Sequence, residues 1–152
     1  MKKLFAVILT IALLMSLSVT SFAANTTEGE ADITTSIAPT YTVTIPADVN
    51  VAFNATKTAF GTIEVTASQI HPDKCIKVAL ATDKELNNAI DNTKVIPYAI
   101  KDSEGAEFTS ATYLTEGDKT ELSIHITADD WNAAYAGDYS DTVTFTVSYE
   151  DK

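Results

Sequence analysis

The sequence predicts an all-β protein, an immunoglobulin-like antiparallel β-sandwich of seven or eight strands that follows a cleaved signal peptide. Three observations lead to this prediction. Apolar and polar residues alternate over most of the chain after residue 40, which is typical of strands with one buried and one solvated face. Turn signals separate these stretches at roughly 8–12-residue intervals, as in sandwiches and barrels. No stretch after the first two dozen residues has a sustained helical period. A small closed barrel is the alternative architecture.

The strands are expected in a defined order along the chain. Their inward residues are, in sequence, Tyr41, Val43 and Ile45; Val49, Val51 and Phe53; Ile63, Val65 and Ala67; Ile76, Val78 and Leu80; Ile96, Tyr98 and Ile100; a weaker strand over 107–114; Leu122, Ile124 and Ile126; and Val143, Phe145, Val147 and Tyr149. Pro46 ends the first ladder, and Pro97 places its strand at a sheet edge, because proline has no backbone N–H to donate. The polar residues 83–94 predict a connection with room for one helical turn.

The N-terminus has the pattern of an export signal. Two lysines precede an apolar run over 4–17, and Ser21 and Ala23 place small residues three and one before a cleavage site. The run is shorter than the roughly 20 apolar residues that a membrane span requires. We therefore predict a signal peptide over 1–23, no integral membrane span, and a secreted, extracellular protein associated with the cell surface.

The remaining 129 residues are enough for one domain with a stable core. Residues 24–38 are polar and predict a flexible leader, and the sandwich is expected over 39–152. Ile33 and Ile37 are the large side chains of the leader, and we predict them as possible strand donors to an open sheet edge. Cys75 is the single cysteine, so packing rather than an internal disulfide must stabilise the fold.

The junction before the last strand has a more specific pattern. Thr127 and Asp130 have capping-box spacing and predict a single helical turn that carries Trp131. Tyr139 then opens the final strand and is predicted as a structural corner that bonds back to this turn, as in immunoglobulin-like sandwiches. We expect Trp131 to plug the end of the sandwich. The alternative is that Trp131 and Tyr135 contact a sugar or a protein partner.

The charge of the chain excludes two classes of partner. The net charge is −11, and loss of Lys2 and Lys3 with the signal peptide leaves −13 with no arginine. Binding to nucleic acid requires clustered lysine and arginine, and so does binding to anionic lipid surfaces. We therefore predict no nucleic-acid partner and assign the acids to solubility.

The residues that carry chemistry form no recognisable site in the sequence. His71 and His125 have no zinc-type spacing, and there is no nucleophile elbow or phosphate loop. Glu64 and Glu121 alternate with core residues and are expected to face solvent rather than a glycosidase cleft. We predict no enzyme, no catalytic residue, no metal and no cofactor. A calcium site remains an alternative for four acids around the Trp131 turn, Asp129, Asp130, Asp138 and Asp141.

Both ends of the mature chain resemble known families. Residues 136–149, AGDYSDTVTFTVSY, are similar to the C-terminal strand of pilin-like proteins of the spore coat protein U type. They are equally similar to the closing strand of secreted surface domains of Gram-positive bacteria, in which an opening strand like residues 41–46, YTVTIP, follows the signal peptide. The resemblance implies an extracellular structural or adhesive subunit, and it carries no catalytic residues. The disulfide of the pilin family is absent from this chain.

Two functions follow as hypotheses. The first is a secreted, non-catalytic structural or adhesive protein of the cell surface, a pilin-like subunit that associates with itself or with another surface protein. The alternative is an extracellular module that binds carbohydrate or protein through the loops near Trp131. The fold class does not separate the two, because sandwiches serve many functions.

Overall fold

The computed structural model of the protein describes residues 30–152, so the predicted signal peptide lies outside the described residues. The described residues divide into two units, residues 30–36 and the compact unit Ile37–Lys152. The described part of the first unit, residues 30–36, is exposed and has no regular secondary structure. Among the described residues, no helix is both long and apolar enough to cross a membrane.

The second unit consists almost entirely of strands. Within residues 30–152 the elements are β1 (Thr40–Thr44), β2 (Lys57–Gln69), β3 (Lys74–Ala81), β4 (Glu85–Asn88), β5 (Val95–Pro97), β6 (Ala99–Lys101), β7 (Ser110–Tyr113), β8 (Lys119–His125), α1 (Ala128–Ala133), β9 (Tyr139–Ser140) and β10 (Thr144–Asp151). The predicted all-β class is confirmed. These ten strands exceed the predicted seven or eight, because several of them are only two to four residues long.

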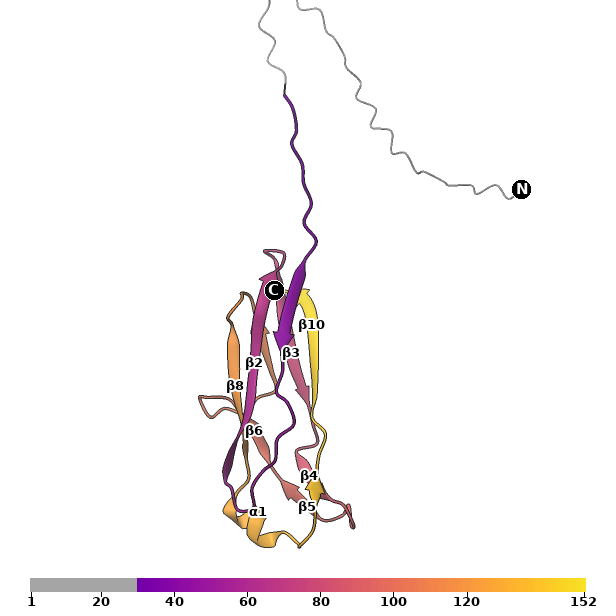
Figure 1. Cartoon of the computed structure of the whole chain (residues 1–152), viewed down its shortest axis with the longest axis vertical. Coiled ribbons are helices and arrows are strands. Elements are labelled where there is room, and N and C mark those ends of the chain that lie inside the picture. The colour runs from indigo at the N-terminus through magenta and orange to yellow at the C-terminus, as the bar shows by residue number, and fades with distance from the viewer. Residues whose placement is uncertain (1–29) are drawn as a thin grey trace, which may run out of the picture. The chain divides into compact units, whose positions relative to one another are not determined.

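The strands form three antiparallel sheets. A four-stranded sheet has the order β1-β2-β8-β6, a second sheet has the order β10-β3-β7, and a small sheet has the order β5-β4-β9. The two larger sheets run along the length of the domain, and the small sheet lies near the end that carries α1 (Figure 1). β1 and β10 are edge strands of different sheets, and they lie side by side over the part of the domain where β1 begins.

One core joins the two larger sheets. Its buried members come from the four-stranded sheet (Ile63, Val65, Ile100, Leu122 and Ile124) and from the β10 sheet (Ile76, Val78 and Tyr113). Apart from Tyr113, these residues lie at the alternating positions predicted to face inward. The pattern therefore identifies the buried face of these strands, because the pleat sends every second side chain to the same side. Two other residues predicted to face inward are exposed, Ile45 at 48% and Val147 at 37%.

Three predicted stretches differ from the structure. Residues 45–56 form no strand, although their apolar residues alternate, and Val49 and Phe53 are 37% and 77% exposed. Residues 83–94 hold strand β4 instead of a helical turn, because β4 finds partners in β5 and β9. The strand expected through Tyr98 is split into β5 and β6, which belong to different sheets. Pro97 lies in an edge strand, as predicted.

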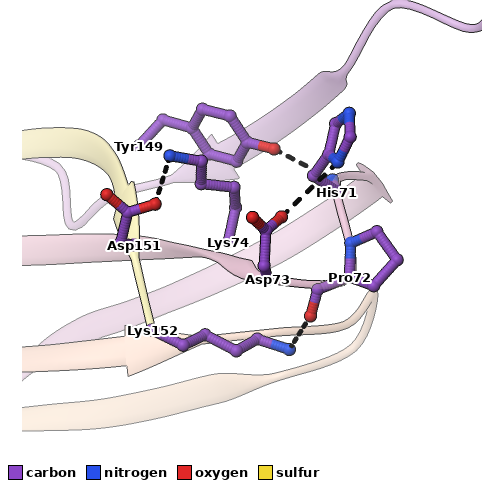
Figure 2. A network of polar contacts seen from close by, with 7 residues as sticks. All are labelled: His71, Pro72, Asp73, Lys74, Tyr149, Asp151 and Lys152. Carbon is purple, nitrogen blue, oxygen red and sulfur yellow. Dashed lines mark hydrogen bonds and ion pairs between the residues drawn. The ribbon is translucent and has the colours of Figure 1, made fainter.

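The end of the sandwich where β1 begins is closed, and we call it the closed end. Tyr41 of β1 stacks on Tyr149 of β10 with ring centroids 5.7 Å apart. Polar contacts then join the β2–β3 turn to the C-terminus: the His71 N–H donates to Tyr149 Oη at 2.9 Å, Lys74 pairs with Asp151, and Lys152 Nζ donates to the Pro72 carbonyl at 2.7 Å (Figure 2). Contacts made by side chains therefore hold β1, the β2–β3 turn and the C-terminus together at this end.

Candidate functional site

The candidate site is a groove of about 870 Å³ toward the other end of the sandwich, which we call the open end. It lies between residues 45–54, which follow β1, and residues 137–143, which precede β10. Its floor consists of apolar core side chains, Phe60, Leu86, Ile96, Ile124 and Phe145. Its volume lies in the upper part of the range of about 300–1,000 Å³ that is usual for ligand pockets.

The two sides of the groove differ in how their backbone is paired. Among the described residues, the backbone of residues 46–54 makes one recorded hydrogen bond, in which the Ala52 carbonyl accepts from the Ala55 N–H at 3.0 Å. In residues 141–143, the recorded backbone bond is from the Thr142 N–H to the Asp141 side chain at 2.6 Å. On the second side the Asp138 carbonyl also accepts from the Ala89 N–H at 2.8 Å, and Tyr139 and Ser140 pair with β4. The groove therefore offers backbone donors and acceptors chiefly along residues 46–54, beside an apolar floor.

The first side of the groove is fixed by a contact between proline and glycine. β1 ends before Pro46, which cannot continue the ladder. Pro46 lies against Gly61, at a bulge in β2, and a Cβ added to Gly61 would come within 3.1 Å of the Pro46 Cβ. Gly61 also has a φ of +136°, which other residues rarely adopt. Only glycine at this position allows the segment after β1 to pack closely on β2.

The second side of the groove is fixed by a polar cluster at Asp141. Thr82 Oγ1 donates to Asp141 Oδ2 at 2.8 Å, and the Tyr98 hydroxyl donates to the same oxygen. The two hydroxyl oxygens, Thr82 Oγ1 and Tyr98 Oη, are 2.7 Å apart. Burial, followed by the hydrogen bond to Asp141, raises the pKa of Tyr98, so its hydroxyl stays protonated and remains a donor. These bonds tie the segment before β10 to β3 and to the β5–β6 junction.

The aromatic residues predicted from the sequence do not form one surface. The Trp131 indole N–H donates to the Ala55 carbonyl at 2.9 Å, and its ring meets Phe53 edge-on at 5.6 Å. Tyr139 Oη donates to the Tyr135 carbonyl at 2.9 Å and accepts from the Tyr135 N–H at 3.1 Å, so the predicted bond to the upstream backbone is present. Tyr139 opens the short strand β9, however, and not the final strand β10 as predicted. Trp131 and Tyr139 line the groove, whereas Tyr135 is 62% exposed beneath Lys94 Nζ.

The two isoleucines of the leader are exposed. Ile33 is 99% exposed in the first unit, and Ile37 is 65% exposed at the start of the second. Residues 37–39 line a small pocket of about 220 Å³ with residues 69–72 of the β2–β3 turn, at the closed end. The chain thus enters the sandwich at the end opposite the groove.

Two of the four acids near Trp131, Asp130 and Asp141, have structural partners for their side chains. Asp130 accepts the Thr127 N–H at 3.3 Å, and its own N–H donates to Thr127 Oγ1 at 3.1 Å, so the predicted capping box is present at α1. Asp141 belongs to the cluster with Thr82 and Tyr98. Within residues 30–152, no group of three or more acids, histidines or cysteines is arranged to hold a metal ion.

The remaining candidates for chemistry lie apart from the groove. Glu64 and Glu121 alternate with buried residues on β2 and β8, and Lys119 lies 3.7 Å from Glu121. His125 Nε2 lies 3.0 Å from Ser123 Oγ. Burial lowers the pKa of His125, and the charges of Lys101 and Lys57 lower it further. Cys75 is buried in β3 and lies 3.7 Å from the Asp151 carbonyl.

Sequence reasoning did not find the groove. The sequence does contain one signal for it: Pro46, which ends a strand, is followed by an alternating apolar stretch that begins at Val49. The alternation predicts a continued strand, whereas the stretch forms no strand and turns at Phe53 and Asn54. A comparison with known proteins does not supply the site either, because no family model and no curated protein match this chain. The resemblance of the two chain ends to surface proteins therefore stays a prediction.

Proposed function

We propose that this protein is a secreted, non-catalytic structural or adhesive protein of the cell surface, and that it works as a subunit that associates with itself by strand addition. The observation that carries the proposal is the groove, which has a largely unpaired backbone along residues 46–54 beside an apolar floor. Free N–H and C=O groups at a sheet edge recruit another extended chain, and pockets for alternate side chains give such pairing its specificity. The groove at the open end has both features.

Other features of the chain agree with this role. The export pattern at the N-terminus directs the protein outside the cell. The leader holds two exposed isoleucines in an otherwise polar segment, which suits a strand that is buried only on association. The strand acids Glu64 and Glu121 alternate with core residues and do not line the groove. These observations favour a binding role over an enzymatic one.

Light scattering tests the proposal. Residues 24–152 are expected to form larger species as concentration rises, whereas a variant without residues 25–38 is expected to associate less. Ile37–Lys152 holds the entire buried core of the described residues, so the variant should keep the β signal in circular dichroism. A mature protein that stays monomeric at high concentration would contradict the proposal.

A second candidate is a module that binds carbohydrate or another protein. The observation in its favour is the exposure of two aromatic rings at the open end, Phe53 at 77% and Tyr135 at 62%. Aromatic rings that present a face to solvent are common anchors for ligands. The matching experiment is a glycan array with the monomeric fraction, on which Phe53→Ala and Tyr135→Ala should each weaken any binding.

A further inference from the structure

We propose that the outer face of the four-stranded sheet carries a binding site for a single tetrahedral oxyanion, a phosphate or sulfate group. The site lies over β2, β8 and β6, which are neighbours in that sheet (Figure 1). Its donors are Lys57, Lys101 and His125, and Ser123 holds the histidine in place. We call these four residues the oxyanion site. It is separate from the groove, and it does not depend on the proposed association of subunits.

The register of the strands places these residues on one face. Six residues form two rows across β2, β8 and β6, in which the members of a row lie directly opposite one another: Lys57, His125 and Ala99 in the first row, and Ala59, Ser123 and Lys101 in the second. Residues directly opposite in antiparallel strands share a face of the sheet, and so do residues two apart in one strand. Ile100 and Ile124 alternate with these residues and are buried in the core, so both rows face outward.

The two lysines stand at opposite corners of this arrangement, and alanines stand at the other two corners. An alanine side chain is a single methyl group, so it leaves the space above the centre open. From strand spacing and rise, the Cα atoms of Lys57 and Lys101 are about 12 Å apart. A lysine stem reaches roughly 6 Å. Both ammonium groups can therefore meet one anion above His125.

The centre of the site is a serine bonded to the histidine. Ser123 Oγ donates to the Lys101 carbonyl at 3.4 Å and lies 3.0 Å from His125 Nε2. Because the hydroxyl proton is directed to the carbonyl, the oxygen accepts from the Nε2–H, and Nδ1 is the nitrogen that is left to meet a ligand. Ser123 is only 7% exposed, although its strand position faces outward. Charges at the centre are therefore screened less by water than on an open sheet face.

The cations of the site have no acid partner, although the chain is strongly acidic. Within residues 30–152, four other lysines are each paired with a carboxylate, Lys74, Lys77, Lys84 and Lys119. Lys57 and Lys101 form no ion pair with any residue of this part of the chain. The acids nearest in register are Glu107, which bridges to the Lys101 backbone, and Glu121, two residues before Ser123. They are the partners of Lys84 and Lys119, so the fold leaves the positive charge of the site uncompensated.

The arrangement of donors suits a tetrahedral oxyanion better than a carboxylate. Two ammonium groups approach from β2 and β6, and the imidazole lies between them, so three donors converge from different directions. Phosphate and sulfate present oxygens in three directions, whereas the two oxygens of a carboxylate lie in one plane and are best matched by the fork of an arginine. The chain has no arginine. A long polyanion is disfavoured as well, because Glu107 and Glu121 border the site and the remainder of the chain is acidic.

A titration with sodium sulfate, followed by nuclear magnetic resonance of residues 24–152, tests the site. Sodium chloride holds the ionic strength constant, and sulfate is the probe because a phosphate ester itself titrates at about pH 6. Lys57→Gln and Lys101→Gln should each weaken sulfate binding by about threefold to tenfold. Lys119→Gln is the matched control, because it removes the same charge from the same face of β8, outside the site. It should bind sulfate as the wild type does.

The protonation of His125 gives a second readout. Lys57 from β2 and Lys101 from β6 face the imidazole, Glu121 lies beyond Ser123 on β8, and the lysine charges together with burial lower the pKa of His125. A bound sulfate favours the imidazolium, so it should raise this pKa. Sulfate should therefore bind most tightly below the pKa of the free site and more weakly as the pH rises through the pKa of the bound site. His125→Asn should remove this pH dependence.

The outcomes separate the inference from general electrostatics. Signal changes that sodium chloride alone reproduces, an equal loss in the Lys119→Gln control, or acetate binding as tight as that of sulfate would each overturn it. Glucose 6-sulfate distinguishes the two sources of the group. Tighter binding of this ester identifies an ester-linked group as the ligand, and tighter binding of inorganic sulfate identifies the free ion. A chain that stays monomeric overturns the proposed function and leaves this test unaffected.

Discussion

The closed end and the open end differ in what happens at the edges of β1 and β10. At the closed end, Tyr41 of β1 and Tyr149 of β10 stack across the gap between the sheets, and polar contacts fasten the C-terminus to the β2–β3 turn. At the open end, the segments that extend these edges separate, and the core between them is reached through the groove. The difference shows that side chains, rather than strand pairing, close the sandwich at the closed end.

The cause of the difference lies in a few residues. Pro46 ends β1, and Gly61 lets the following segment pack on the bulge of β2 instead of pairing beside β10. On the other side β10 begins only at Thr144, because Asp141 is held by Thr82 and Tyr98. Neither segment reaches the other, and no strand of the described chain lies between them.

The largest expected effect is a difference in the free energy of unfolding that is lost when a core residue is truncated away from the groove or in the groove floor. Ile76 is fully buried in β3, so Ile76→Ala should lower the free energy of unfolding by about 2–5 kcal/mol. Phe145 packs on the core but lines the groove, so Phe145→Ala should cost only about 1–2 kcal/mol of burial. Urea unfolding of both variants measures this. Equal losses would mean that the groove floor is as well buried as the closed end.

The sequence predicts the buried faces of the long strands and two local features of the open end. The inward residues of β2, β3 and β8 follow from the alternation, because each strand has one face on the core. The capping box of Thr127 and Asp130 and the bond of Tyr139 to the upstream backbone are local patterns, and both are present. Such features depend on residues that are close in sequence, so a single sequence is enough to find them.

The groove could not be predicted in the same way. Val49, Val51 and Phe53 alternate as a strand does, yet whether they form one depends on a partner that is distant in sequence. β4 is the converse case, because its polar sequence pairs with β5 and β9, which begin up to about 50 residues later. The sides of the groove are likewise set by contacts far apart in the chain, such as Thr82 with Asp141.

A smaller effect is expected at the corner beside the groove. Tyr139→Phe removes the hydroxyl that bonds to the Tyr135 backbone, and it leaves the ring in place. The loss should be about 0.5–1.5 kcal/mol, the net contribution of one hydrogen bond. The change in the urea midpoint at constant m-value measures this loss of stability. An unchanged midpoint would show that the corner does not hold this side of the open end.

The smallest expected effect is a difference between the two ends in how stability depends on pH. His125 on β8 follows Ile124, which lines the groove, and burial together with Lys101 and Lys57 lowers its pKa below the usual value near 6.5. The unfolded chain therefore binds more protons than the folded one as pH falls through this range. Stability that is complete above about pH 6.5 should be lost as the pH approaches the folded pKa.

The closed end should respond only in stronger acid. Hydrogen bonds from the Leu114 and Thr115 N–H groups lower the pKa of Asp118, so its contribution is complete above about pH 4 and is lost as pH falls through its folded pKa. His125→Asn should therefore flatten the stability profile between about pH 7 and pH 5 without changing the steeper loss below pH 4. Urea titrations across this range test the point, with His71→Asn as the matched control at the closed end. If that control flattens the profile equally, the effect does not belong to His125, and acid does not distinguish the two ends.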